Sequence, residues 1–199
     1  MSNSTMEEKI LLSTFYSFEP FVPAAHAFSP TKIILFVDKD VEKIKNHLEK
    51  VRELYSKVSS IEIVKVDGAN LLEVASKTAE VLEKASTPVI VNVSGGWKLL
   101  AQGVLYGCYA RPSFVEKIIC NKIEDNTLVE LPKLSFGLSS AKKELLLEIS
   151  KRNGKSIAQI ASKLGKTRGM LYQHLKELKD LGYVDSSFKI TEAGRLGVL

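Results

Sequence analysis

The chain has 199 residues, 45% of them hydrophobic and 26% charged, with a formal net charge of +5. This composition is typical of globular proteins, and the length fits one large domain or two small ones. It contains no run of about twenty apolar residues that could span a membrane, and residues 1–9 do not resemble a secretion signal. Cys108 and Cys120 have no neighbouring His or Cys to complete a metal site, so we expect reduced thiols in a cytoplasmic protein.

The first 138 residues alternate apolar strands with amphipathic helices. We predict strands at residues 10–15, 32–37, 61–66, 89–93 and 114–119, helices at 41–58, 71–84 and 96–109, and a hairpin over 122–131. Repeated strand–helix units with apolar strands favour a parallel sheet covered on both faces. The predicted fold class is therefore α/β, with a Rossmann-like domain over 1–131, a linker over 132–139 and a second domain over 140–199.

The loop after the fourth predicted strand contains two glycines and a lysine. It reads Asn92-Val93-Ser94-Gly95-Gly96-Trp97-Lys98. We expect Ser94 to cap the next helix, and the backbone N–H groups at the helix start to form an anion site together with Lys98. The alternative is a glycine-rich helix start that serves packing alone. The dinucleotide fingerprint G-x-G-x-x-G is absent after the first strand, and so is a P-loop, which argues against a nicotinamide- or ATP-dependent enzyme.

Open parallel sheets bind ligands beyond the carboxyl ends of their strands, near the point where the strand order reverses. The loops after the first and fourth strands are therefore the candidate ligand site. The aromatic residues of the first loop also suit core packing, and we expect one of them to reach the ligand. The predicted ligand-binding residues are Phe15, Tyr16, Ser17, Phe18, Asn92, Ser94, Gly95, Gly96, Trp97 and Lys98.

Residues 139–199 carry two short amphipathic helices joined by a tight turn at Gly165. Apolar residues at steps of three and four form one face of each helix. They are Ile157, Ile160, Ala161 and Leu164, and then Leu171, Leu175 and Leu178. A helix-turn-helix is built in this way, with its second helix in the DNA major groove. Residues 183–185 and 188–191 predict a small β-hairpin that turns at Ser186 and Ser187, the wing, before a short segment capped by Thr191.

Charge separates the two halves of the chain. From residue 139 onward there are twelve Lys and Arg against six Asp and Glu, a net charge of +6, whereas residues 1–138 have sixteen against seventeen, a net charge of −1. A basic excess of this kind is typical of a phosphate-binding surface, so we predict binding of double-stranded DNA. The alternative is a winged helix used only for protein contacts. The predicted DNA-binding residues are Ser156, Gln159, Lys166, Thr167, Arg168, Tyr172, Gln173, Lys176 and Lys189.

The strand–Asn-x-Ser-Gly-Gly-x-Lys–helix pattern followed by a winged helix resembles the archaeal CRISPR-associated regulators of the CARF (CRISPR-associated Rossmann fold) family. Asn92, Ser94, Gly96 and Lys98 match the family pattern, whereas Trp97 stands where a small hydroxyl residue is common. Residues 17–19, Ser-Phe-Glu, occupy the position of a Gly-Phe-Asp/Asn motif. The resemblance implies a homodimer that binds cyclic oligoadenylate, with cyclic tetra-adenylate as the expected ligand, across its two-fold axis and regulates CRISPR loci.

Two other functions stay open. Some CARF proteins cleave their cyclic ligand without a metal, and Lys98 and Ser17 are the residues suited to that role here. The acid–base candidates are poor, because His26, His47 and His174 are expected on helices and Glu19 is the one carboxylate expected near the site. A scaffold that does not bind DNA is the third function. The Trp97 ring either stacks on an adenine or packs at the dimer interface.

Overall fold

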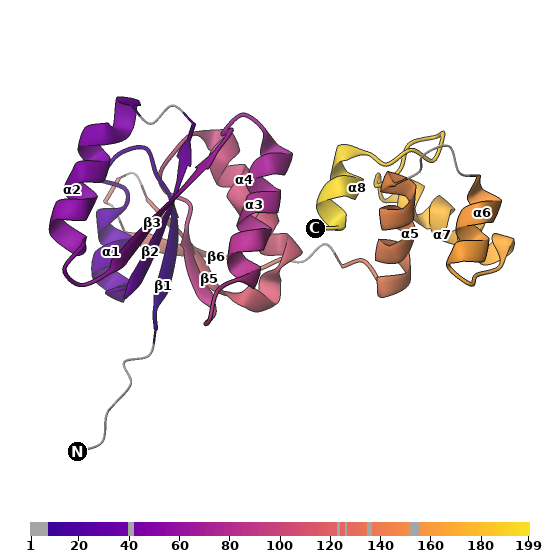
Figure 1. The fold of residues 1–199 in the computed structure, drawn as a ribbon, viewed down its shortest axis with the longest axis horizontal. Helices are drawn as coiled ribbons and strands as arrows, with labels where there is room; N and C mark the ends of the chain where they lie inside the picture. The colour runs from indigo at the N-terminus through magenta and orange to yellow at the C-terminus, as the bar shows by residue number, and fades with distance from the viewer. Residues whose placement is uncertain (1–7, 40–41, 123, 126, 135–136, 152–155) are drawn as a thin grey trace, which may run out of the picture. The chain divides into compact units, whose positions relative to one another are not determined.

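The computed structural model describes residues 8–39, 42–122, 124–125, 127–134, 137–151 and 156–199. The chain folds into two compact units, residues 1–135 and 136–199 (Figure 1). The first is a Rossmann-like α/β domain and the second is a winged helix-turn-helix, so the predicted fold class is confirmed.

The first unit is built on one six-stranded sheet in the order β3-β2-β1-β4-β5-β6. Its strands are β1 (Ile10–Thr14), β2 (Lys32–Asp38), β3 (Ser60–Val66), β4 (Val89–Asn92), β5 (Val115–Asn121) and β6 (Leu128–Leu131). The first five strands are parallel, and β6 pairs antiparallel with β5, as the predicted hairpin requires. Because β1 pairs with both β2 and β4, the strand order reverses between β1 and β4.

Helices cover both faces of the sheet (Figure 1). The short α1 (Val22–Phe28) and α2 (Lys45–Tyr55) lie on one face, and α3 (Leu71–Glu83) and α4 (Lys98–Ala110) lie on the other. Each face has its own apolar core, because the strands are buried on both sides and alternate side chains enter opposite layers. Two 3₁₀ turns, η1 (Glu42–Ile44) and η2 (Pro112–Phe114), precede α2 and β5.

The helices α3 and α4 pack against each other through two glycines. A Cβ added at Gly103 would lie 2.6 Å from Val74 Cβ, and one added at Gly107 would lie 2.4 Å from Thr78 Cβ. Real Cβ atoms do not approach neighbours so closely. The spacing of four residues places both glycines on one face of α4, where they allow the two helix backbones to approach.

The start of α4 differs from the prediction. We expected a helix from residue 96 with Ser94 as its cap, but α4 begins at Lys98, and its N-cap residue Trp97 makes no side-chain cap. Gly96 has a φ of +79°, a backbone conformation that ends the loop and delays the helix. The predicted helix over 41–58 is also shorter, since its described start is the turn η1, and residue 41 lies outside the described residues.

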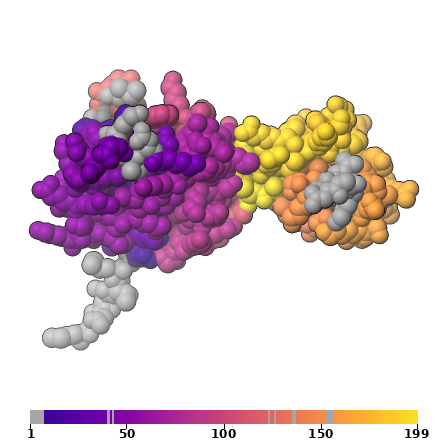
Figure 2. Space-filling view, turned by 45° about the horizontal axis from the view of Figure 1, so that its top comes forward, coloured from indigo at the N-terminus to yellow at the C-terminus, as the bar shows by residue number. Residues whose placement is uncertain are grey.

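The second unit packs four helices around one core. They are α5 (Ser140–Ser150), α6 (Ile157–Lys163), α7 (Arg168–Asp180) and α8 (Glu192–Gly197). The leucines predicted to line α7 are fully buried, and Gly165, with a φ of +62°, forms the turn between α6 and α7. The wing consists of one antiparallel bridge between Val184 and Ile190, and Thr191 caps α8 as predicted. In the space-filling view the wing and α8 form a continuous yellow surface (Figure 2).

Candidate functional site

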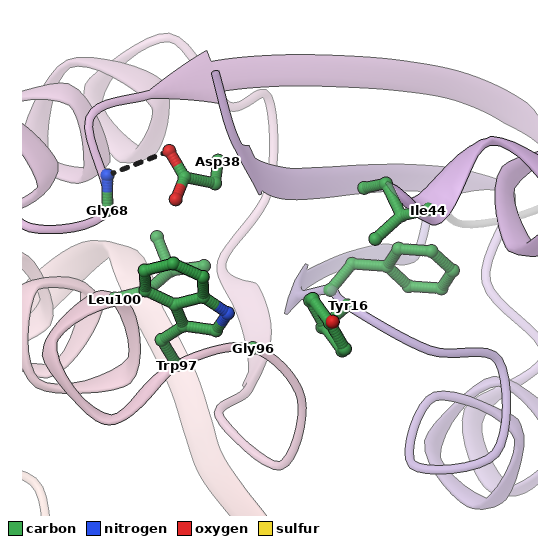
Figure 3. A pocket seen from close by; sticks show the side chains of 8 residues that line it. Tyr16, Asp38, Ile44, Gly68, Gly96, Trp97 and Leu100 are labelled. Carbon is green, nitrogen blue, oxygen red and sulfur yellow. Dashed lines mark hydrogen bonds between the residues drawn. The ribbon is translucent and has the colours of Figure 1, made fainter. Parts of the chain in front are cut away.

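A pocket opens at the carboxyl ends of the central strands, where the strand order reverses. The last residue of β2 and residues that follow β1, β3 and β4 contribute to it, together with η1 and α4 (Figure 3). The pocket is open to solvent. The lining residues are Phe15, Tyr16, Asp38, Ile44, Gly68, Gly96, Trp97 and Leu100. This position is the ligand site expected of an open α/β sheet.

The glycine loop after β4 lies directly against the end of β1. A Cβ added at Gly95 would lie 2.4 Å from the backbone oxygen of Thr14, so only glycine fits there. The hydroxyl of Thr14 donates a hydrogen bond to the carbonyl of Gly95 at 2.5 Å. These contacts hold the following residues, Gly96 and Trp97, at the edge of the pocket.

Two of the predicted ligand-binding residues stabilise the loop from behind. The Asn92 side chain is fully buried, and its Nδ2 donates to Ser13 Oγ at 3.1 Å and to the carbonyl of Pro20 at 3.3 Å. The hydroxyl of Ser94 lies within hydrogen-bonding distance of Asn92 Oδ1 and accepts the backbone N–H of Asn121 at 2.8 Å. Neither side chain lines the pocket, so both tie the β4 loop to β5 and to the loop after β1.

The aromatic residues after β1 divide between core and pocket. Phe15 is buried and packs edge-on against Phe21, with ring centroids 6.0 Å apart, while it also reaches the pocket. Phe18 packs against the same ring at 6.5 Å, and Ser17 is half-buried outside the pocket lining. Tyr16 and Trp97 are 44% and 52% exposed and both line the pocket. Their rings are therefore accessible to a flat ligand.

Lys98 lies at the first position of α4, next to the pocket but not in its lining. Its side chain is exposed. The N-terminus of a helix carries partial positive charge and unpaired N–H groups. Lys98 and the start of α4 therefore place positive charge beside the pocket.

The carboxylate of the pocket is Asp38, and the expectation that Glu19 would be the one carboxylate near the site is wrong. Glu19 is exposed and does not line the pocket. Hydrogen bonds from its own backbone N–H and from the Ser17 hydroxyl lower the pKa of Glu19. Asp38 was not among the residues predicted from the sequence. It ends β2, which pairs with β1, so the meeting of carboxyl ends in a parallel sheet is the signal that could have identified it.

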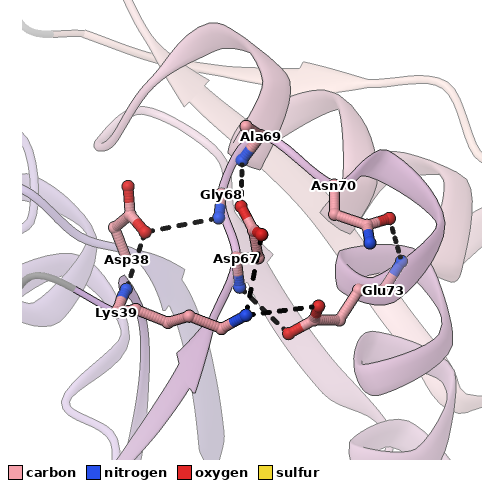
Figure 4. Close-up of polar contacts among 7 residues, drawn as sticks. All are labelled: Asp38, Lys39, Asp67, Gly68, Ala69, Asn70 and Glu73. Carbon is pink, nitrogen blue, oxygen red and sulfur yellow. Dashed lines mark hydrogen bonds and ion pairs between the residues drawn. The ribbon is translucent and has the colours of Figure 1, made fainter.

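Polar contacts fix the loops around Asp38 (Figure 4). The Lys39 ammonium lies 3.6 Å from both Asp67 Oδ2 and Glu73 Oε2. Glu73 Oε1 also accepts the backbone N–H of Asp67 at 3.0 Å, and Asn70 caps α3 through the N–H of Glu73. These contacts join the ends of β2 and β3 to the start of α3.

The outer face of α7 presents four of the nine predicted DNA-binding residues. Arg168, Tyr172, Gln173 and Lys176 are exposed, on the side opposite the buried leucines. The Tyr172 ring contacts Phe188 of the wing edge-on, with centroids 6.4 Å apart, which joins this helix to the wing.

The other predicted DNA-binding residues lie at helix starts and on the wing. Ser156 and Gln159 form a reciprocal capping box at the start of α6, and Thr167 caps α7 through the N–H of Met170. Lys166 is half-buried in the turn before α7, and Lys189 is exposed on the wing. The caps use the side chains of Ser156, Gln159 and Thr167 within the protein, so these three have less freedom to bind DNA than the α7 residues.

Residues 25–131, more than half of the chain, match the family described as the Csa3 CRISPR-associated Rossmann-like domain. The chain belongs to this family. Residues 139–186 match the arsR family of bacterial regulatory proteins, which is a helix-turn-helix family. The resemblance to CRISPR-associated Rossmann-fold regulators is thereby confirmed, and the first unit is called the CARF domain below.

Solved structures with the fold of this CARF protein share little sequence with it. A type III CRISPR defence DNA nuclease activated by cyclic oligoadenylate matches 88% of the chain at 15% identity with a TM-score of 0.50. A Vibrio cholerae protein matches 95% at 14% identity with a TM-score of 0.52, and Can2 from Sulfobacillus thermosulfidooxidans, solved with cyclic tetra-adenylate, matches 95% at 15% identity with a TM-score of 0.49. The chain spans 34%, 64% and 62% of these proteins, respectively. No curated protein matches it.

The histidines and cysteines lie outside the pocket lining of the CARF domain. His26 is exposed, and His47 Nδ1 accepts the backbone N–H of Phe18 at 3.4 Å. Cys108 and Cys120 are free, and burial raises the pKa of the Cys108 thiol to about 12. Among the described residues, no cluster of His, Cys, Asp and Glu is arranged to hold a metal, and no helix is long and apolar enough to cross a membrane.

Proposed function

We propose that this protein is a ligand-responsive transcriptional regulator of CRISPR–Cas loci, in which the CARF domain binds cyclic oligoadenylate and the winged helix binds double-stranded DNA. The proposal rests on the presence of a ligand-binding domain and a DNA-binding domain in one chain. A CARF domain with a pocket at its strand-order reversal is joined to an arsR-type helix-turn-helix. A sensor and a DNA reader on one polypeptide are the parts that a regulator needs.

The expected ligand is cyclic tetra-adenylate. The DNA nuclease of similar fold is activated by cyclic oligoadenylate, which supports this ligand class. The exposed rings of Tyr16 and Trp97 suit stacking on adenine, a contact that contributes about 1–3 kcal/mol per base. The start of α4 and Lys98 suit the phosphates, because helix N-termini bind anions.

The active form in this proposal is a homodimer. A cyclic ligand with repeated nucleotides suits a two-fold axis, where each subunit contributes one pocket. Two recognition helices also match two operator half-sites when they are spaced about 34–36 Å or a multiple apart. The net charge of +6 on residues 139–199 favours DNA over a protein partner.

Titration of operator DNA with and without saturating cyclic tetra-adenylate, at one fixed salt concentration, tests the proposal. The nucleotide should change operator affinity, and operator should change nucleotide affinity by the same factor, because coupling is reciprocal. The chain contains one tryptophan, Trp97, so its fluorescence reports binding at the pocket directly. Identical operator curves in a sample whose fluorescence shows bound nucleotide would contradict regulation by this ligand.

The role of Lys98 is tested by Lys98→Ala. Loss of a charge-assisted phosphate contact, about 1.5–3 kcal/mol, should weaken cyclic tetra-adenylate binding about tenfold or more. Lys84→Ala is the matched control, because Lys84 is also exposed but lines a different pocket, with residues from the start of β1 and β2. Unchanged affinity of Lys98→Ala by calorimetry would argue against the cationic role. Analysis of the nucleotide after incubation separates the ring-nuclease alternative, since a regulator leaves the ring intact.

A further inference from the structure

Among the described residues that line the pocket of the CARF domain, Asp38 is the one with a charged side chain, and that side chain is an anion. Asp38 lies among aromatic and apolar residues, of which Trp97, Leu100 and Ile44 are examples (Figure 3). A phosphate placed here would meet a carboxylate with the same sign of charge. A neutral aromatic ring that offers a hydrogen-bond donor suits the pocket better, because an ionised carboxylate only accepts hydrogen bonds.

The two oxygens of Asp38 are not equivalent. Oδ1 accepts the backbone N–H of Lys39 at 2.6 Å and the backbone N–H of Gly68 at 3.4 Å. These donors use the lone pairs of Oδ1 and hold the carboxylate in one orientation. Among the described residues, no hydrogen bond reaches Oδ2, and Figure 3 shows the second oxygen turned toward the side of the pocket formed by Leu100 and Trp97.

Lys39 follows Asp38 in the chain, but among the described residues its ammonium pairs with other carboxylates. The ammonium of Lys39 lies 3.6 Å from the carboxylates of Asp67 and Glu73 (Figure 4). The described residues next to Asp38 thus include two further carboxylates and one ammonium, whereas Lys98 lies at the start of α4. The site therefore has an anionic side at Asp38, which accepts hydrogen bonds, and a cationic side at Lys98, which attracts phosphates.

We propose that Asp38 determines base specificity by accepting the exocyclic amine of an adenine through Oδ2, while Tyr16 and Trp97 flank the ring. This proposal rests on the proposed function, since it assumes that the pocket holds a base of the cyclic nucleotide. Guanine offers two adjacent donors and pairs best with both oxygens of a carboxylate. Because Oδ1 is occupied by two backbone donors, one oxygen is left, and one oxygen matches the single amine of adenine.

The decisive experiment compares cyclic tetra-adenylate with cyclic tetra-inosinate on the full-length wild-type protein. Inosine replaces the amine of each base with a carbonyl oxygen and adds a hydrogen at the neighbouring N1. A base in the same position would turn its carbonyl oxygen toward the Asp38 carboxylate, and its N1–H donor would be displaced from the position of the amine. Trp97 fluorescence, checked by calorimetry, should show that the inosinate ring binds about tenfold more weakly or worse. Equal affinities for the two rings would overturn the assignment, and this arm needs no variant.

Asp38→Asn tests the residue itself. Asparagine keeps an oxygen for the N–H groups of Lys39 and Gly68, and its amide can donate to the inosine carbonyl. The variant should bind the adenylate ring more weakly and the inosinate ring more tightly than wild type does. Its affinities for the two rings should then differ by about threefold or less. Glu62→Gln is the matched control. It removes one negative charge from an exposed side chain that pairs with Lys32 at the start of β2, away from the pocket, and it should keep the wild-type ratio of the two affinities.

The outcomes separate this inference from the proposed function. Wild-type protein that binds neither ring, by fluorescence and by calorimetry, overturns both proposals together. Binding of the adenylate ring with full discrimination retained in Asp38→Asn overturns the role of Asp38 alone and leaves the proposed function standing. A smaller ratio of adenylate to inosinate affinity in Asp38→Asn but not in Glu62→Gln supports the assignment.

Discussion

In the CARF domain the residues around the pocket are held from several sides, whereas in the C-terminal unit the candidate DNA-binding residues stand on the outside of one helix. Gly95 and Gly107 have neighbours that leave no room for a Cβ, while Gly165 and Gly169 have nothing within 4 Å of one. The pocket is thus shaped by tertiary contacts between distant segments. The α7 face is shaped by helical periodicity, which is a local property of the sequence.

Because the two units have separate cores, we expect a core substitution in the second unit to abolish DNA binding and leave nucleotide binding intact. Leu175→Ala removes a fully buried side chain from the second core and should destabilise that unit by about 2–5 kcal/mol. DNA binding should be lost while the Trp97 fluorescence response to cyclic tetra-adenylate persists. Leu181→Ala is the control, because Leu181 follows the same helix but is 58% exposed, and it should retain DNA binding. Loss of the nucleotide response in Leu175→Ala would show that the CARF domain depends on the second core.

The two kinds of glycine should respond to alanine with opposite signs. Gly107→Ala forces a Cβ against Thr78 and should lower the free energy of unfolding by about 1–3 kcal/mol. Gly169→Ala meets open space in α7 and should raise it by about 0.5–1 kcal/mol, because alanine restricts the unfolded chain. Thermal or denaturant unfolding of the two variants measures both effects. A neutral Gly107→Ala would mean that α3 and α4 move apart at little cost.

Substitutions on α7 should divide by the part of DNA that each side chain contacts. Arg168→Ala should reduce discrimination between operator and random DNA by about 1–3 kcal/mol, if Arg168 reads a base edge. Lys176→Ala should weaken binding to all DNA alike and reduce the salt slope by about 1, as expected for a lost phosphate contact. Binding assays at several salt concentrations measure both. Wild-type DNA affinity in both variants would show that α7 is not part of the DNA interface.

The smallest expected effect concerns the half-buried ion pair between α5 and α7. Lys142 Nζ lies 2.8 Å from Glu177 Oε2, and its hydrogen bond lowers the pKa of the Glu177 carboxyl below its ordinary 4.5. A carboxyl with a lowered pKa in the folded state stabilises the fold above pH 4.5 and loses that contribution as pH falls through the lowered value. Glu177→Gln should therefore be slightly less stable than wild type at pH 7, and the difference should vanish in acid.

Unfolding curves at pH 7 and at pH 3, in low salt, measure this difference. Glu144→Gln is the control, since Glu144 is exposed on α5 and has no ion pair among the described residues. A difference of equal size at both pH values would exclude the ion pair as its source.

The order of the elements, the α/β class and the helix-turn-helix could be predicted without the structure. Apolar periodicity reports burial directly, so Leu171, Leu175 and Leu178 were assigned to the core and Arg168 and Tyr172 to the surface from spacing alone. The loop between Asn92 and Lys98 was also identified from its glycines and from its place after a strand. These features depend on interactions between residues close in the chain.

Tertiary structure decided which side chains of the loops face the pocket. Asn92 and Ser94 turn inward because Ser13, Pro20 and Asn121, which come from distant segments, offer them hydrogen bonds. Asp38 enters the pocket because the pairing of β1 with β2 brings the end of β2 beside the loop after β1. Strand pairing and loop packing join residues far apart in sequence, and no local pattern records which way a loop side chain turns to satisfy its hydrogen bonds.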